Sequence, residues 1–434
     1  MKFISTISRR WCRTNQSSVM LLGLGFIIAL PCVGESPVNL KQALELTLKQ
    51  NAELKSYPLI VRGAEALELQ AEVTPNPIVN IEIENSIGSG DYQGLDSSEI
   101  NLVYSQQIEL GNKQQNRVNF ASAETRRLQS EYQLSRLDVL AETSRRYYQN
   151  IFLQQQQTLI EKKITSEKNA LTVIQKRAKA GAVGEADVSK MALRLARSEV
   201  RKEQLAAELK QAQTRLAAMW MAEAEFNVVN GRFDQIPEVP NRKSIIVALE
   251  KLPSVHYQIA LQRLSETRLK LAQSNGQSDM TFKVGLTQHQ QTSDQSLNFA
   301  FSMPLAFENP NRGRIKAAQT AIEKSYMEVE THKKQLELRL LEIRQQLLNQ
   351  KGSANLLNTR LLPLAKKLLA ETEKGYQTGR YSVLQWIDAQ SEVFSIEQSM
   401  LKLHWQVYRQ ILELERITGQ SMAKSTTLLT GEKQ

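Results

Sequence analysis

The sequence predicts a mainly α-helical fold with a transmembrane β part, built as two tandem repeats that each contain a β-strand pair and a long helical hairpin. Three observations predict this fold class: helical apolar spacing over a long stretch without proline or glycine, four segments in which apolar and polar residues alternate, and matching residues in the two halves of the chain. Only 19 of the 434 residues are glycine and 6% are aromatic, which favours long helices. The composition excludes a collagen, a disulfide scaffold and a polytopic helical membrane protein.

Residues 1–34 have the pattern of a secretory signal peptide. Basic residues precede an apolar run over 19–30, and small residues end the segment at Gly34. The run is too short for a membrane-spanning helix, which needs about 20 residues; the alternative is a short membrane anchor that the mature chain keeps. Cleavage after Gly34 would remove both cysteines, Cys12 and Cys32, so that neither a disulfide nor a thiolate site could stabilise the mature chain. The basic residues are Lys2, Arg9, Arg10 and Arg13.

The remaining charges and motifs exclude several functions. The formal net charge is +10, but four of the basic residues belong to the leader and the others are interspersed with acidic ones, whereas nucleic-acid binding needs a basic patch or stripe. No Ser/His/Asp arrangement, phosphate loop or zinc-spaced His/Cys cluster is present, and the four histidines stand alone, whereas a metal site needs three or four converging ligands. We therefore expect no enzymatic activity, no cofactor, no bound metal and no nucleic-acid partner.

The two halves of the chain repeat each other. The segment 100–105 resembles 297–302, and the same offset pairs Arg117 with Arg314 without a gap. Several matches in the same order indicate a duplication rather than chance. The predicted parts are a signal peptide at 1–34, a first repeat at 38–221, a linker at 222–243, a second repeat at 244–420 and a flexible tail at 421–434.

Each repeat contains the pattern of a long antiparallel helical hairpin. From 113 to 180 neither proline nor glycine occurs, and apolar residues recur at spacings of three, four and seven. A helix of that length extends about 100 Å. Gly181 ends it, as glycine commonly does where the chain turns left-handed after a helix. The second hairpin turns at Gly379, and Pro363 must kink or break its outgoing helix.

The four alternating segments are predicted β-strands with one apolar and one polar face. One interpretation is the half-buried strands of a soluble sandwich or hairpin cap. We favour transmembrane strands of about 9–11 residues, because four strands cannot enclose a core between such long helices. A sheet in lipid must close, and three chains together would supply twelve strands. Asn80, Glu82 and Glu84 are then expected to face the barrel lumen, and Ile81 and Ile83 the lipid. The segments are 77–87, 99–110, 280–288 and 296–307.

An exported chain of two such repeats resembles the TolC-like outer-membrane efflux family over nearly all of its mature length, and the turns at Gly181 and Gly379 are the more specific match. Four segments resemble the heavy-metal branch of that family, of cobalt–zinc–cadmium or copper–silver type. Two residues depart from the branch: Asn112 replaces a glycine and Gln114 replaces an arginine. The four segments are 75–77, 82–85, 88–90 and 107–113, followed by Arg117.

The resemblance implies a homotrimer in which a twelve-stranded β-barrel in outer-membrane lipid stands on an α-helical barrel in the periplasm. The chain would be the passive exit duct for heavy-metal cations in a tripartite system with a periplasmic adaptor (membrane fusion) protein and an inner-membrane RND-type pump. One alternative keeps the fold but exports drugs or proteins. Another, of a different class, is a soluble periplasmic coiled-coil adaptor or scaffold, although an adaptor would have a single hairpin between lipoyl-like halves.

The resemblance also implies two groups of site residues at the hairpin tips. Asp187 and Tyr376 would be hydrogen-bonded across neighbouring hairpins in the closed tunnel, and Asp388 would form a three-fold carboxylate ring at its entrance. A second ring aspartate of the family falls on Gln385, and its switch arginine falls on Tyr381, so that Arg380 would substitute for it. Without the resemblance, each would be a solvated helix residue. The expected gate residues are Asp187, Tyr376, Arg380 and Asp388. The expected adaptor contacts are Ala180, Gly181, Ala182, Val183, Gly379 and Ser382.

Overall fold

The computed structural model describes residues 37–92, 95–233, 239, 241–305 and 307–420. The expected signal peptide and C-terminal tail lie outside the described residues. Among those described, no helix is both apolar enough and long enough to cross a bilayer.

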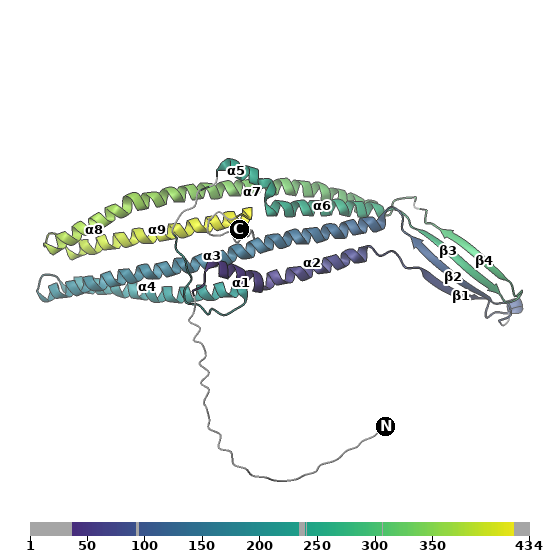
Figure 1. The fold of residues 1–434 in the computed structure, drawn as a ribbon, viewed down its shortest axis with the longest axis horizontal. Helices are drawn as coiled ribbons and strands as arrows, with labels where there is room; N and C mark the ends of the chain where they lie inside the picture. Colours follow the sequence, from purple (N-terminus) through teal and green to yellow (C-terminus); the bar gives the residue numbers. More distant parts are fainter. Residues whose placement is uncertain (1–36, 93–94, 234–238, 240, 306, 421–434) are drawn as a thin grey trace, which may run out of the picture. The chain divides into compact units, whose positions relative to one another are not determined.

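The two repeats follow the same order of elements (Figure 1). Each begins with two consecutive helices, continues into a strand pair and ends in a helical hairpin. The first repeat consists of α1 (Leu40–Gln50), α2 (Ala52–Ala71), β1 (Ile78–Glu84), β2 (Glu99–Ile108), α3 (Lys113–Lys179) and α4 (Glu185–Ala217). The second consists of α5 (Arg242–Ala248), α6 (Pro253–Ser274), β3 (Met280–His289), β4 (Gln295–Ser302), α7 (Arg312–Leu356), α8 (Leu362–Gln377) and α9 (Val383–Thr418). The predicted order is confirmed, except that the first helix of each repeat is divided.

Asn51 divides the first helix. It ends α1, and its side-chain oxygen accepts a hydrogen bond from Leu54 N–H at the start of α2. Its amide group donates to the carbonyl of Met219 at 2.9 Å. An asparagine that caps a helix in this way satisfies a backbone N–H that would otherwise lack a partner.

Helix α3 is the central element of the described unit. It packs against α1, α2, α4, α6 and α9, and its 67 residues extend about 100 Å. The sheet follows one end of the long helices and the hairpin turns lie at the other (Figure 1). Pro363, where a kink or break is expected, changes the helical pattern without ending the helix: α7 passes into a π-helical turn, Leu357–Leu361, and α8 continues with Pro363 in its first turn, because proline lacks the N–H that an uninterrupted α-helix would need.

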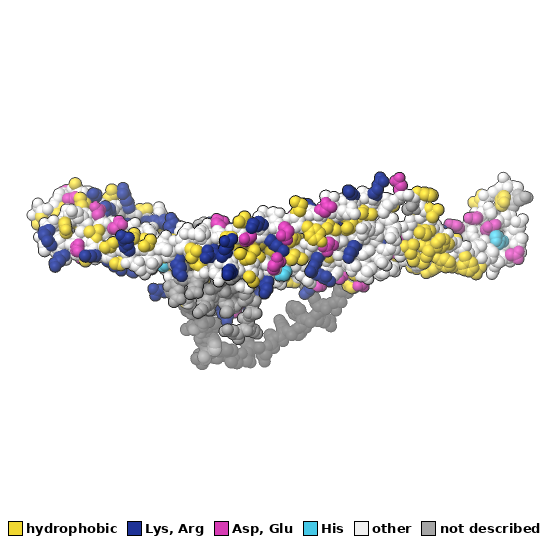
Figure 2. All heavy atoms as spheres, turned by 90° about the horizontal axis from the view of Figure 1, so that it is seen from above, with side chains coloured by type: hydrophobic (Ala, Val, Ile, Leu, Met, Phe, Trp, Pro, Cys, Tyr) yellow, Lys and Arg dark blue, Asp and Glu magenta, His cyan; other side chains and the backbone are white. Residues whose placement is uncertain are grey.

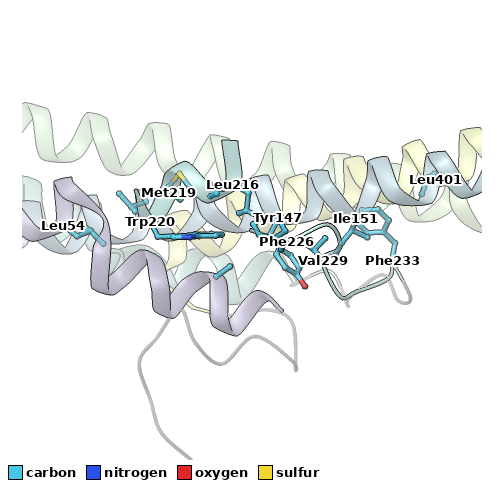
Figure 3. Packing of buried hydrophobic residues seen from close by; sticks show 13 residues of the cluster. Leu54, Tyr147, Ile151, Leu216, Met219, Trp220, Phe226, Val229, Phe233 and Leu401 are labelled. Atoms are coloured by element: carbon cyan, nitrogen blue, oxygen red, sulfur yellow. The ribbon is translucent and has the colours of Figure 1, made fainter. Parts of the chain in front are cut away.

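The linker between the repeats is part of the core rather than a simple spacer. Phe226, Val229 and Phe233 are buried in a cluster with Tyr147 of α3 (Figure 3). Val38 forms a parallel β-bridge with Val229. Burial raises the pKa of Tyr147 to about 12, as expected for a hydroxyl whose ionised form would be poorly solvated. The segment at 226–233 therefore attaches the start of the first repeat to the middle of α3.

The four strands form one antiparallel sheet in the order β1-β2-β3-β4. Three of the predicted strands are too long at their C-terminal ends. β1 ends at Glu84 because Asn85 is left-handed, with φ of 52°. β2 ends at Ile108, before the left-handed Gly111. β4 ends at Ser302, two residues before Pro304, which cannot donate to a strand ladder.

Candidate functional site: sheet faces and hairpin tips

The strand register separates polar from apolar side chains over most of the sheet. Glu82 lies opposite Asn101, which lies opposite Thr287. Directly opposed residues of antiparallel strands project from the same face, so the polar residues of neighbouring strands meet. The Thr287 hydroxyl donates to Asn101 Oδ1, and Asn298 Nδ2 donates to Thr287 Oγ1 at 2.7 Å. Asn80 and Glu84, two residues to either side of Glu82, share this polar face.

On the polar face, the row of residues nearest the loops that join the strands carries charged side chains. Glu84 lies opposite Glu99, and Glu99 lies opposite His289. Nδ1 of His289 is 3.3 Å from Oε1 of Glu99. At the other end of the same face, Lys283 lies opposite Ser105. The acidic groups are therefore concentrated near the loops that join β1 to β2 and β3 to β4.

The opposite face of the sheet is apolar and uncovered in the described chain. Ile81 is 70% exposed and Phe299 is 66% exposed, and Leu102 and Leu286 continue the row that Ile81 begins. Figure 2 shows hydrophobic side chains gathered over the sheet, whereas Lys and Arg are spread along the helices. A contiguous apolar surface of this kind indicates contact with lipid or with another protein.

The segment 107–113, which carries the heavy-metal-branch motif, forms the joint between β2 and α3. Asp279, before β3, accepts hydrogen bonds from Lys113 Nζ at 2.6 Å, Gln107 Nε2 at 2.9 Å and Leu110 N–H at 3.2 Å. Arg117 forms a two-pronged ion pair with Glu109. These contacts connect the strand ends to the first turns of the long helix.

Both departures from the branch motif fit the structure. Asn112 is left-handed, with φ of 56°, and asparagine tolerates that conformation better than most residues. The side-chain amide of Gln114 donates to the carbonyl of Glu72. Asn112 and Gln114 are therefore both accommodated in the joint.

The first hairpin turn, 180–183, is a Schellman motif. Gly181 has a φ of +72°, Ala182 N–H donates to Arg177 O and Gly181 N–H donates to Ala178 O, both at 2.9 Å. A Cβ on Gly181 would meet no atom within 4 Å, so the glycine is needed for its backbone conformation and not for space. The expected left-handed helix end is confirmed.

The second turn repeats this geometry. Gly379 has a φ of +76°, and Arg380 N–H donates to Gly375 O at 2.8 Å. The Arg380 side chain is exposed. The ring of Tyr381 packs against Gly375 so closely that a Cβ there would lie 2.0 Å from Tyr381 Cδ2. Tyr381, at the position of the family's switch arginine, therefore fixes the turn by packing, which the sequence reasoning did not predict.

Ser382 and Gln385 cap α9. Ser382 Oγ accepts from Gln385 N–H at 3.3 Å, and Gln385 Oε1 accepts from Ser382 N–H at 2.8 Å. This reciprocal pair is a capping box. Gln385, the position of the family's second ring aspartate, is therefore part of a helix cap, and the Ser-x-x-Gln spacing is a sequence signal that could have revealed it.

Tyr376 lies in a buried cluster that joins the two hairpins near their turns. It is 4% exposed and stacks on Trp386, with ring centroids 5.2 Å apart and planes 9° apart. The guanidinium of Arg177 lies 4.0 Å from the ring centroid of Tyr376 and donates to its carbonyl at 3.2 Å. Burial raises the pKa of Tyr376, although the charge of Arg177 lowers it. The cluster consists of Ala170, Ile174, Met191, Tyr376, Val383, Trp386 and Ile387.

Two polar groups of this cluster have no partner in the part of the chain that the structure describes. They are the Tyr376 hydroxyl and Nε1 of Trp386, both buried. Within one chain the expected hydrogen bond between Tyr376 and Asp187, in the first turn of α4, is therefore not formed. A bond to Asp187 of a neighbouring chain remains a prediction, and it would satisfy a hydroxyl that is costly to leave unpaired.

Asp388 is 67% exposed on α9 but is not a lone carboxylate. Nη2 of Arg194, on α4, lies 2.9 Å from its Oδ1, and Nη1 of Arg194 lies 3.4 Å from Ser391 Oγ. Sequence reasoning missed Arg194. Arg194 lies two turns after Asp187 on α4. The sequence alone does not show which part of α9 lies beside this part of α4, so it could not predict the pairing with Asp388. Among the described residues, no group of three His, Cys, Asp or Glu side chains is placed to hold a metal ion.

Known proteins share this arrangement. Residues 43–220 match the family of outer membrane efflux proteins. The chain is 23% identical over 398 residues to the cobalt-zinc-cadmium resistance protein CzcC of Cupriavidus metallidurans, which covers 92% of this chain and 94% of that protein. The fold of this chain is similar to that of CusC, with a TM-score of 0.72 and 14% identity; the match covers 88% of this chain and 92% of CusC. The outer membrane protein VceC of Vibrio cholerae gives a TM-score of 0.71, 14% identity and coverage of 88% and 97%.

The matched segment 43–220 spans nearly all of the first repeat, and the second repeat has the same element order and the same Schellman turn. The chain therefore resembles outer membrane efflux proteins over residues 43–220 and CzcC over nearly its whole length.

Proposed function

We propose that this chain is the outer-membrane exit duct of a tripartite efflux system that exports heavy-metal cations. The observation that carries the proposal is the strand register, which places Glu82, Asn101 and Thr287 on one face of the sheet and Ile81, Leu102 and Leu286 on the other. A strand with one lipid-facing and one water-facing side is the pattern of a transmembrane barrel.

The sheet also supports a homotrimer. β1 and β4 are its edge strands, and an open edge in lipid would leave backbone N–H and C=O groups without partners. Pairing of β4 of one chain with β1 of the next would remove all edges. Three copies of a four-stranded sheet would form a twelve-stranded barrel, with the helical hairpins beneath it in the periplasm.

The hairpin turns are the proposed docking points for a periplasmic adaptor, which would connect the duct to an inner-membrane RND-type pump. Both turns are made by Schellman motifs, and the first is flanked by the small residues Ala180 and Ala182, so another helical tip could approach it closely. The chain itself would be a passive conduit, because a pump at the inner membrane would supply the energy.

The proposed cargo follows from two observations. CzcC, whose name describes cobalt, zinc and cadmium resistance, covers nearly the whole chain. The polar face of the sheet carries Glu82, Glu84 and Glu99, so a lumen lined by three copies would be acidic in its outer half and would attract cations.

Expression in a host that lacks its own metal-efflux duct, together with a metal-type pump and adaptor, tests the proposal. We expect severalfold higher tolerance to cobalt, zinc or cadmium, and a heat-sensitive trimer in the outer-membrane fraction on electrophoresis. Higher tolerance to drugs alone would contradict the metal cargo. A heat-insensitive monomer in the soluble periplasmic fraction would contradict the duct.

A further inference from the structure

The two hairpins of one chain are joined near their turns by an arginine of the first and a carboxylate of the second. Arg194 on α4 approaches Asp388 at 2.9 Å and Ser391 at 3.4 Å, both on α9. Its side chain is 29% exposed and that of Asp388 is 67% exposed. The pair therefore faces water on one side, and its charges cancel where Asp388 alone would leave a negative charge.

Arg194 is placed where it neutralises Asp388, whereas another arginine of the same groove is not. Arg194 lines a groove of about 490 Å³ between α3, α4 and α9. Arg201, two turns further along α4, also lines the groove but pairs at 2.8 Å with Glu208 of its own helix. Arg194 is the arginine of the groove that reaches Asp388.

We propose that Arg194 determines the ionic selectivity of the periplasmic entrance by neutralising Asp388. The inference rests on the proposed trimeric duct and on the three-fold ring of Asp388 at its entrance that the family resemblance implies. The entrance would then carry three neutral ion pairs and not a ring of three free carboxylates. An ion pair this exposed is weak, so that separation of α4 from α9 would release the carboxylates and make the entrance attractive to cations.

The expected size of the effect follows from Coulomb's law. A unit charge about 7 Å from an ion changes the local concentration of that ion about threefold in water, and less when salt screens it. For three carboxylates at about 0.1 M salt, loss of Arg194 should raise the cation-over-anion permeability ratio by roughly fivefold. Loss of Asp388 leaves Arg194 unpaired and should shift the ratio toward anions by a similar factor.

Reversal potentials of the assembled trimer in planar lipid bilayers under a KCl gradient test the proposal. We expect Arg194→Gln to be more cation-selective than the wild type and Asp388→Asn to be more anion-selective. The double variant Arg194→Gln/Asp388→Asn should return to within about twofold of the wild-type ratio, because both charges are gone. Arg201→Gln is the matched control on the same helix and should change the ratio much less, since its pair lies about 10 Å further along α4.

An unchanged ratio in Arg194→Gln, or an equal rise in Arg201→Gln, would overturn the inference while leaving the duct intact. Absence of any conducting trimer in the wild type would overturn the proposed function as well. If Arg194→Gln assembles poorly, Arg194→Cys gives the same information, because residues 37–434 contain no other cysteine. A positively charged methanethiosulfonate reagent should restore the wild-type ratio in Arg194→Cys, and a neutral reagent should not; restoration by both would contradict the proposal.

Discussion

At the scale of single residues, three glycines are under different structural constraints. Gly375 faces Tyr381 with no room for a Cβ, Gly181 has room but a left-handed backbone, and Gly352, within α7, has neither constraint. We expect Gly375→Ala to destabilise the helical part by about 1–3 kcal/mol through overpacking and Gly181→Ala by about 1–2 kcal/mol. Gly352→Ala should stabilise it by about 0.5–1 kcal/mol. Thermal unfolding followed by circular dichroism at 222 nm measures all three, and a loss of stability in Gly352→Ala equal to that in Gly375→Ala would refute the packing argument.

Glu413 provides a prediction about pH. Two hydrogen bonds from Arg416 lower its pKa, against burial, which raises it. Because the folded pKa lies below the unfolded value, the stabilisation is present above the unfolded pKa and is lost as the pH falls through the folded one. Glu413→Gln should cost about 1–2 kcal/mol at pH 7 and flatten the loss of stability below pH 4.5, near the ordinary carboxyl value. Melting temperatures between pH 3 and 7 would measure this, and parallel curves for the two proteins would contradict it.

At the scale of elements, the two faces of β1 predict opposite responses to one substitution. Ile81→Lys would place an ammonium group on the apolar face and should cost about 2–4 kcal/mol in the membrane. Glu82→Lys, one residue away, adds the same group to the polar face and should be tolerated. The amount of heat-sensitive trimer in outer membranes should fall in the first variant alone; equal losses would mean that β1 does not separate lipid from water.

The loops at 86–98 and 288–296 are predicted to lie outside the cell. Each joins the two strands of one pair, at the end of the sheet away from the helices (Figure 1). An epitope tag in either loop should bind antibody on intact cells, whereas a tag at Gly352 should bind only after the cells are broken. Tags that stay hidden in both loops of intact cells would reverse the topology.

The elements that sequence predicted well are those that depend on local spacing. Alternating apolar and polar residues predicted the strands, and the absence of proline and glycine predicted α3, because each pattern lies within a single element. The end of β1 was predicted too late because the left-handed residue there is Asn85 and not a glycine. Gly111 and Pro304 were sequence signals for the ends of β2 and β4. The packing of Phe226 and Phe233 and the Arg194–Asp388 pair depend on how distant segments meet, which periodicity cannot reveal.

At the scale of the whole molecule, the duplication explains why one chain has two similar tips and a single sheet. Each repeat contributes two strands and one hairpin, so neither repeat encloses a channel alone. The polar face of the sheet becomes a lumen only if several chains close it, and the apolar face then meets lipid. The central claim is therefore that the polar face lines a water-filled pore.

Cysteine accessibility in a conducting trimer tests that claim most directly. Residues 37–434 contain no cysteine, so Glu82→Cys and Ile81→Cys each introduce a single thiol on adjacent residues of β1. A charged, membrane-impermeant methanethiosulfonate reagent should change the single-channel current of Glu82→Cys within minutes and leave that of Ile81→Cys unchanged. Modification of Ile81→Cys with no effect on Glu82→Cys, or the absence of conductance in both variants and in the wild type, would contradict the account.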